Sequence, residues 1–256
     1  DWTNDPELRG RKYDWDNVCP GDQWRHSHNY MHHHYTNIVG KDRDVGYGIL
    51  RMADEQPWHP GYIFQPVYAL ALALFFEWGV GVHDLELSEL LKGKWKWSEK
   101  KDMVKAFLKK TRKQVLKDYV AFPLLAGPFF LPVLAGNVVA NIIRNIWAFM
   151  IIFCGHFTED AEMFTEAECE NESKADWYLR QLMGSSNIEG GKWMHIMSGN
   201  LSHQIEHHMF PDIPANRYAE LAVEVKALCE KYDLPYNTGT LSKQFGTVVK
   251  RIFRLS

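Results

Sequence analysis

Hydrophobic residues gather in the middle of the chain and leave both flanking parts polar. An apolar run covers residues 63–82, and the most hydrophobic region, 119–157, divides at Ala135-Gly136-Asn137 into two pieces. Each piece approaches the ~20 residues that a membrane-spanning helix needs. The first piece must kink or begin outside the hydrocarbon because it contains three prolines, Pro123, Pro128 and Pro132.

The polar parts of the chain predict further helices joined by loops. Nothing breaks a helix from Gln23 to Thr36, and Asp22 is placed to act as its N-cap. Helices are also expected in three later stretches, 177–183, 192–209 and 215–232. Residues 1–22 and 41–60 carry prolines and glycines and are expected to form loops. The pattern predicts an all-α fold.

Histidine is the residue type that indicates chemistry. Of the twelve histidines, eight lie in two short runs: His26, His28, His32, His33 and His34, then His203, His207 and His208. His28 and His32 are expected on one face of a helix, and His33 points about 100° away, which suits a ligand for a second metal ion. Buried imidazoles need partners for both ring nitrogens, and neutral imidazole is a good ligand for Fe, Zn, Cu and Ni. The two runs therefore predict a metal site.

Other features limit the class of protein. No histidine follows a Glu-x-x-His or His-Glu-x-x-His pattern, so neither a ferritin-like diiron site nor a zinc protease helix is indicated. The four cysteines form no Cys-x-x-Cys pair, which argues against structural zinc and a disulfide framework. With 29 basic and 32 acidic residues the net charge is −3, and nucleic acid is not an expected partner.

One shared metal site constrains how the chain crosses a membrane. Both histidine runs must then lie on one side, so the number of crossings between them is even. The basic stretch Lys92–Lys117, with eleven Lys or Arg, should stay cytoplasmic. These conditions favour 119–135 and 137–155 as a membrane hairpin within 119–156, with 63–82 in the interface or half embedded. A mean hydropathy of −0.34 also indicates few spans below a large helical cytosolic part.

Two motifs carry a family resemblance. His-Asn-x-x-His-His…Thr-Asn (28–37) and Gln-Ile-Glu-His-His-x-Phe-Pro (204–211) closely resemble the second and third histidine boxes of membrane fatty acid desaturases. Shorter matches continue along nearly the whole chain: Asp44-Val-Gly-Tyr-Gly, Phe76-Glu-Trp-Gly-Val, Lys117-Asp-Tyr-Val-Ala-Phe-Pro, Cys154-Gly-His, Ser198-Gly-Asn-Leu and Tyr232-Asp-Leu-Pro-Tyr. The sequence looks closest to bacterial acyl-CoA desaturases of the stearoyl-CoA type.

The resemblance implies a diiron centre held almost wholly by histidine. Its expected metal ligands are His28, His32, His33, His156, His207 and His208. Gln204 stands where many relatives place a further histidine and is expected to ligate weakly or through water. The expected neighbours that orient the ligands are His203, Asn29, Asn200 and Glu206. The family's first histidine box and earlier membrane helices are expected just upstream of residue 1, so residues 1–256 are expected to form one desaturase domain that is incomplete at its N-terminus and inactive alone.

The activity that the resemblance implies is O₂-dependent desaturation of a long-chain acyl thioester, with two iron ions as the cofactor. The expected partners are an acyl-CoA or lipid-linked acyl chain, O₂, membrane lipid, and an external electron donor of the ferredoxin, cytochrome b5-like or flavin reductase type. The expected location is an integral membrane protein with its metal site on the cytoplasmic side. Two alternatives remain open, a hydroxylase of the same superfamily and a non-catalytic metal-binding membrane fragment.

Overall fold

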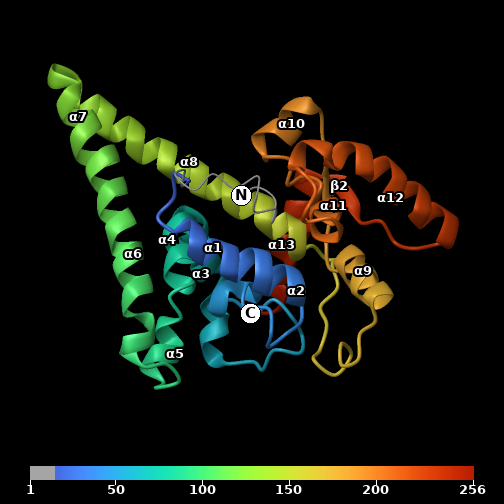
Figure 1. Ribbon diagram of the computed structural model, residues 1–256. Helices are drawn as coiled ribbons and strands as arrows, with labels where there is room; N and C mark the ends of the chain where they lie inside the picture. The colour runs from blue at the N-terminus through green and yellow to red at the C-terminus, as the bar shows by residue number, and fades with distance from the viewer. Residues whose placement is uncertain (1–14) are drawn as a thin grey trace.

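The computed structural model describes residues 15–256, and the part of the predicted N-terminal loop before residue 15 lies outside it. Two long helices form a hairpin, and the other elements gather around the end of the second one (Figure 1). The first arm is α6 (Trp97–Leu116), which continues through a π-helical turn (Lys117–Ala121) into α7 (Phe122–Leu125). After a 3₁₀ turn (Gly127–Phe129), the chain returns along α8 (Phe130–His156).

The hairpin differs from the predicted one in where it turns. α8 passes without a break through residues 135–137, so the expected division there is wrong. Gly136 has open space around it, and the side chain of Asn137 donates to the backbone oxygen of Asp118 on the other arm, at 2.5 Å. The turn instead lies at Gly127, whose φ of +56° glycine adopts readily. The membrane location of the hairpin stays a prediction.

The apolar run at 63–82 forms two helices with a sharp bend between them. α3 (Gln65–Leu74) follows a 3₁₀ turn (Pro60–Phe64) and meets α4 (Phe76–His83) at an angle of 100°. Asn145 of α8 stabilises the break: its Oδ1 accepts from the Glu77 N–H (3.2 Å), and its Nδ2 donates to the Leu74 carbonyl (2.9 Å). Within the described residues, one helix, Gly127–His156, is long and apolar enough to cross a membrane, or two if the bent pair counts as one.

The first histidine run lies on a helix whose winding changes along its length. α1 (Gly21–Trp24) leads into a π-helix (Arg25–His32) and ends in α2 (His33–Tyr35), so the predicted helix is confirmed. Pro20 rather than Asp22 occupies the N-cap position. A π-helix closes its turns between residues five apart, so it aligns side chains differently from an α-helix. This difference decides how the histidines group.

Figure 1 shows α5 (Leu87–Leu91) beside the start of α6, and the remaining helices towards the C-terminal end of α8. These are α9 (Lys174–Met183), α10 (Lys192–Met197), α11 (Gln204–Met209), α12 (Tyr218–Tyr232) and α13 (Leu241–Arg254). Short 3₁₀ helices lie at Val45–Gly48 and Ala215–Arg217. The helix predicted at 192–209 is interrupted, because Gly199 and Asn200 adopt positive φ between α10 and α11. The predominance of helix confirms the predicted fold class.

Two short strands were not predicted. β1 (Asn187–Glu189) and β2 (Thr238–Thr240) pair in parallel, with Asn187 opposite Thr238. β1 follows α9 in the chain, and β2 leads into α13. Both strands lie at the C-terminal end of α8. The main hydrophobic core lies next to them, where Phe149 and Phe153 of α8 stack with ring centroids 3.9 Å apart. This core fixes the end of α8 that carries His156.

Candidate metal centre

Six histidines converge at the C-terminal end of α8 and form two groups of three. The first triad consists of His28, His33 and His207, and the second triad consists of His32, His156 and His208. In each triad one ligand atom per ring lies within 4.8 Å of the others. The structure therefore brings together all six residues that the resemblance implied as metal ligands.

The grouping of the first run follows from the π-helix. His28 and His33 are five residues apart and contribute to the same triad, whereas His32 belongs to the other. The rings of His28 and His32 also lie near one another, with centroids 5.4 Å apart, but His33, which was expected to serve a second ion, joins the triad of His28. His26 and His34 lie on another side of the helix, where both stack against Tyr30.

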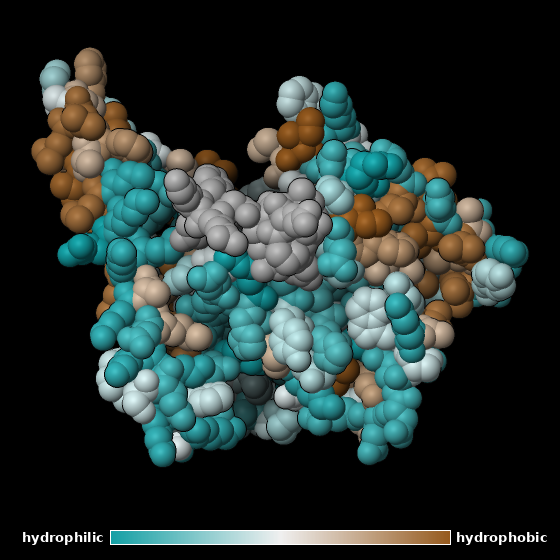
Figure 2. Space-filling model, in the orientation of Figure 1, coloured by the Kyte–Doolittle hydropathy of each residue, from teal (hydrophilic) through white to brown (hydrophobic). Residues whose placement is uncertain are grey.

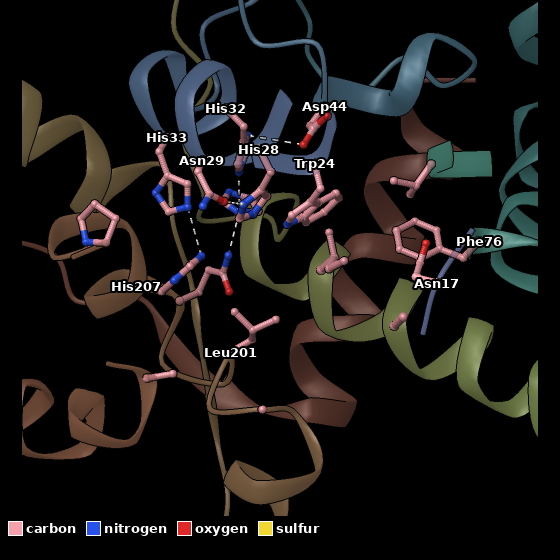
Figure 3. Close-up of a pocket in the computed structure, with 18 of the residues that line it drawn as sticks. Asn17, Trp24, His28, Asn29, His32, His33, Asp44, Phe76, Leu201 and His207 are labelled. Carbon is pink, nitrogen blue, oxygen red and sulfur yellow. Dashed lines mark hydrogen bonds and ion pairs between the residues drawn. The ribbon is translucent and has the colours of Figure 1, made fainter. Parts of the chain in front are cut away.

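The ring nitrogens inside each triad lie very close together. In the second triad, the Nε2 atom of His156 is 3.3 Å from that of His32 and 3.1 Å from that of His208. In the first triad, the Nε2 atoms of His33 and His207 are 3.1 Å apart, and the two rings point towards one another in Figure 3. Two nitrogens bound to one metal at ~2.1 Å are expected about 3.0–3.4 Å apart at octahedral to tetrahedral angles. The observed separations fit a shared ion in each triad.

Hydrogen bonds on the outer side of the rings fix which nitrogen is free to ligate. The Nδ1 of His32 donates to Asp42 (2.9 Å), and that of His208 lies 3.1 Å from the Gln181 Oε1. A ring that carries its hydrogen on Nδ1 presents the lone pair of Nε2 to the centre of the triad. The tautomers set by these contacts are therefore those that a metal ion requires.

The rings of the first triad are anchored by neutral partners. The Nδ1 of His28 lies 3.0 Å from the Asn29 Oδ1, and that of His207 lies 3.1 Å from the Tyr218 hydroxyl. The Trp24 ring stacks on His28 with centroids 4.4 Å apart. These contacts hold His28 and His207 at the wall of a cavity.

Burial keeps most of these rings neutral. It lowers the pKa of His28, His33 and His208 well below the usual value, and neighbouring histidines lower it further. Burial and the charge of His32 lower the pKa of His207 to about 3. For His32, burial acts in the same direction, but Asp42 and Asp44 outweigh it and raise the pKa. Neutral imidazole is the ligating form, so the lowered pKa of these four other rings favours the binding of a cation over that of protons.

The ring nitrogens of the second triad also fit a bound cation, because without one several of these buried polar atoms lack suitable hydrogen-bond partners. The lone pairs of His32 and His208 both face the Nε2 of His156, which could donate to at most one of them. The Nε2 of Gln204 lies 2.9 Å from the same nitrogen, while its Oε1 is buried without a hydrogen-bond partner among the described residues. A metal ion accepts several lone pairs at once and removes this conflict.

The other expected neighbours differ in their placement. Asn29 and Gln204 touch the triads, as described above. His203 instead stacks on His195, with ring centroids 4.6 Å apart, and Asn200 lies in the turn before α11. The Glu206 carboxylate accepts from Asn187 and Tyr236, both at 2.9 Å, and stabilises α11.

Several hydrogen-bond partners of the triad histidines were not identified from the sequence, because these partners lie far away in the sequence or on other elements. Asp42 comes ten residues after His32, Gln181 lies on α9, and Tyr218 begins α12. Only Asp42 carried a local signal, since two acids, at 42 and 44, follow the first histidine run closely. No pattern in one sequence marks Gln181 or Tyr218 as a neighbour of histidine.

A cavity of about 510 Å³ lies against the triads. His28, His32, His33, His156 and His207 all line it. Apolar side chains continue the wall along α4 and α8: Phe76, Val80, Ala148 and Ile152. The triads therefore face an apolar space, and Figure 3 shows Trp24 and Phe76 lying on the same side of them.

The comparisons with known proteins agree on one family. A family model for fatty acid desaturases matches residues 15–240. The NADPH-dependent stearoyl-CoA 9-desaturase of Mycobacterium tuberculosis is 46% identical over 260 residues, covering 100% of this chain and 61% of that protein. The sn-1 linoleoyl-lipid 6-desaturase of Synechocystis sp. is 30% identical, covering 83% of this chain and 60% of that protein. No solved structure matches the chain significantly.

The fold and the site define a helical, histidine-rich metal protein with an apolar helix long enough to cross a membrane. The match to the fatty acid desaturase model over residues 15–240 identifies the family. The chain belongs to the fatty acid desaturase family, which confirms the resemblance seen in the two histidine boxes. It spans about three fifths of the length of the two relatives named above.

Proposed function

We propose that this chain carries the diiron centre of an enzyme that desaturates a long-chain fatty acyl thioester with O₂. The observation that supports the proposal is the pair of histidine triads beside an apolar cavity. Six imidazoles with few carboxylates suit a redox metal, and an apolar cavity suits an acyl chain. The 46% identity to a protein named for stearoyl-CoA favours an acyl-CoA over a lipid-linked chain as the substrate.

The overall reaction balances as one –CH₂–CH₂– unit, O₂, two electrons and two protons giving one –CH=CH– unit and two waters. The iron pair, when bound, supplies the reduction of O₂ and the abstraction of hydrogen. His28, His33 and His207 would hold one ion, and His32, His156 and His208 would hold the other. The electrons come from an external donor of the ferredoxin, cytochrome b5-like or flavin reductase type.

The protein residues contribute by positioning the substrate and excluding water. Trp24, Phe76 and Ile152 line the cavity and would hold the acyl chain against the triads. Fixing the reacting carbons near the metal replaces an encounter in solution by a reaction within one complex. The apolar wall also limits the access of water to the reacting carbons. The shape of this wall would therefore decide which carbons react.

We further propose that the protein is integral to the membrane, with its metal centre at the cytoplasmic face. Exposed apolar side chains cover the far end of the hairpin: Leu116, Val120, Phe122, Leu124, Leu125, Phe129 and Leu131. Figure 2 shows this apolar end separated from a largely polar lower half. The basic face of α6 lies between these two regions and suits the cytoplasmic headgroups, either as a solvated face or in contact with anionic lipid.

The direct test is product analysis with the purified full-length enzyme, reductant and a saturated acyl-CoA. The proposal expects about two iron ions per chain and an unsaturated product with consumption of O₂. A hydroxylated acyl chain as the main product would show that the enzyme is a hydroxylase rather than a desaturase. Bound zinc without O₂ consumption would instead indicate a non-catalytic metal-binding protein.

A further inference from the structure

Helix α9 places two buried polar residues, Arg180 and Gln181, against the histidine-bearing segments. The Arg180 guanidinium donates to the carbonyl oxygens of Thr36 and His34, both at 2.9 Å, and pairs with Glu172 at 2.6 Å. These carbonyls lie at the C-terminal end of the first histidine helix, where backbone oxygens lack intrahelical partners. Arg180 thus anchors α9 beside the metal centre.

Gln181 contacts both triads from this anchored position. It is fully buried, with an exposed fraction of 0%. Its Nε2 donates to the backbone oxygen of His33 at 3.2 Å, and its Oε1 lies 3.1 Å from the Nδ1 of His208. Because a carbonyl can only accept, the amide nitrogen must face His33, and the amide oxygen must then face His208.

We infer that Gln181 is a positioning residue of the metal centre, which sets the tautomer and the ring orientation of His208. Accepting the Nδ1 hydrogen directs the Nε2 lone pair of His208 into the second triad, next to His156. The bond to His33 also ties the first histidine helix to α11 through one side chain. This inference rests on the proposed metal-binding function.

Thr36 provides a second, weaker acceptor for the same hydrogen. Its Oγ1 lies 3.2 Å from the Nδ1 of His208, and its own hydrogen is directed to the His32 carbonyl at 2.8 Å. Loss of the Gln181 amide alone would therefore leave His208 one partner. Removing both acceptors should have a larger effect than removing either one.

The test compares the iron affinities of purified variants by competition with a chelator. Gln181→Leu keeps the size of the side chain and removes the acceptor, so iron in the second triad should bind about 10-fold more weakly. The double variant Gln181→Leu with Thr36→Val should bind it about 100-fold more weakly. Gln181→Glu keeps an oxygen facing the Nδ1 and should stay within about 3-fold of the wild type, since a carboxylate accepts strongly.

The glutamate variant separates positioning from a purely structural role. A buried carboxylate facing the His33 carbonyl should destabilise the fold, so a structural role predicts that Gln181→Glu loses more iron than Gln181→Leu. Gln65→Leu is the matched control: within residues 15–256 this buried glutamine bonds only to the backbone of Arg51 and Ile252. It should lower the melting temperature of the iron-free protein and leave iron affinity unchanged.

Three results would overturn the inference. One is a Gln181→Glu variant that binds iron more weakly than Gln181→Leu, another is equal loss of iron in Gln65→Leu and Gln181→Leu, and the third is unchanged iron affinity in Gln181→Leu. Failure of the proposed function would look different, because the wild-type protein itself would then bind no iron. An iron-loaded wild type with unchanged affinity in Gln181→Leu contradicts only the role of Gln181.

Discussion

The two triads are built from the same side chain but differ in burial and in the charge around them. All three rings of the second triad are buried, and His32 among them bonds to Asp42. In the first triad His28 and His207 are only partly buried, although histidines of both triads line the cavity. Their outer partners, Asn29 and Tyr218, are neutral.

This difference indicates that the two ions would be held unequally. A carboxylate behind a ligating imidazole increases its basicity and strengthens the metal bond. The second triad should therefore bind an ion more tightly, whereas the partly buried rings of the first triad would leave an ion there more exposed.

The largest expected effect comes from removing a ligand of the second triad. His208→Ala and His32→Ala should abolish turnover and lower iron content below about one ion per chain, because each leaves only two rings around the buried ion. Iron analysis and an acyl-CoA turnover assay measure both effects. His59→Ala is the control, since this exposed histidine caps a 3₁₀ turn at Pro60–Phe64. Equal losses in all three variants would contradict the assignment.

Stepwise removal of the metal should show directly that the two triads bind their ions with different affinities. With increasing chelator, the ion of the first triad should leave first, and the midpoints for the two ions should differ by about 10-fold or more. Residual iron measured after each step gives the two midpoints. His28→Ala should remove the earlier step alone, so a single step with two equivalent ions in the wild type would argue against the comparison.

Removing the negative charge of Asp42, which bonds to His32, should bring the metal affinities of the two triads closer together. Asp42→Asn keeps a hydrogen-bonding side chain but loses the carboxylate, so the later chelation step should shift by about 10-fold towards the earlier one. The same titration measures this shift. Asp54→Asn is a suitable control, because Asp54 pairs with Arg254 on the surface. An unchanged later step in Asp42→Asn would exclude the carboxylate as the source of the inequality.

The smallest effect is expected at the neutral support of the first triad. Tyr218→Phe removes the hydroxyl beside His207 and should shift the earlier chelation step by only about 5-fold, since one neutral hydrogen bond contributes about 1 kcal/mol. The later step should not move. A larger shift in the later step would mean that Tyr218 acts on the second triad instead.

The sequence correctly predicted which histidines lie together but not how they are grouped. All six expected histidines converge, because the two boxes are local motifs whose residue types are visible directly. Their division into triads could not be foreseen, since the winding of Arg25–His32 as a π-helix aligns residues five apart rather than four. The partners Asp42, Gln181 and Tyr218 were missed because their contacts depend on tertiary packing.

In the hairpin, too, the sequence predicted the apolar region but not the position of the turn. Hydropathy located the region correctly, but the break assigned to residues 135–137 lies inside α8. There the side chain of Asn137 finds its partner on the other arm, which no local rule reveals. The chain reaches the turn along the basic helix α6 and returns along α8. Both histidine runs lie at the C-terminal end of α8, and the number of membrane crossings between them stays a prediction.

By itself the sequence determined the helical class, the family and the identity of the six histidines. These properties depend on residue types and spacings that are contained within short segments. Only the tertiary structure decided which three rings meet, which side chains fix their tautomers and where the apolar cavity lies. Such relations join segments more than one hundred residues apart, as between His33 and His207, so they arise only when the helices pack around the end of α8.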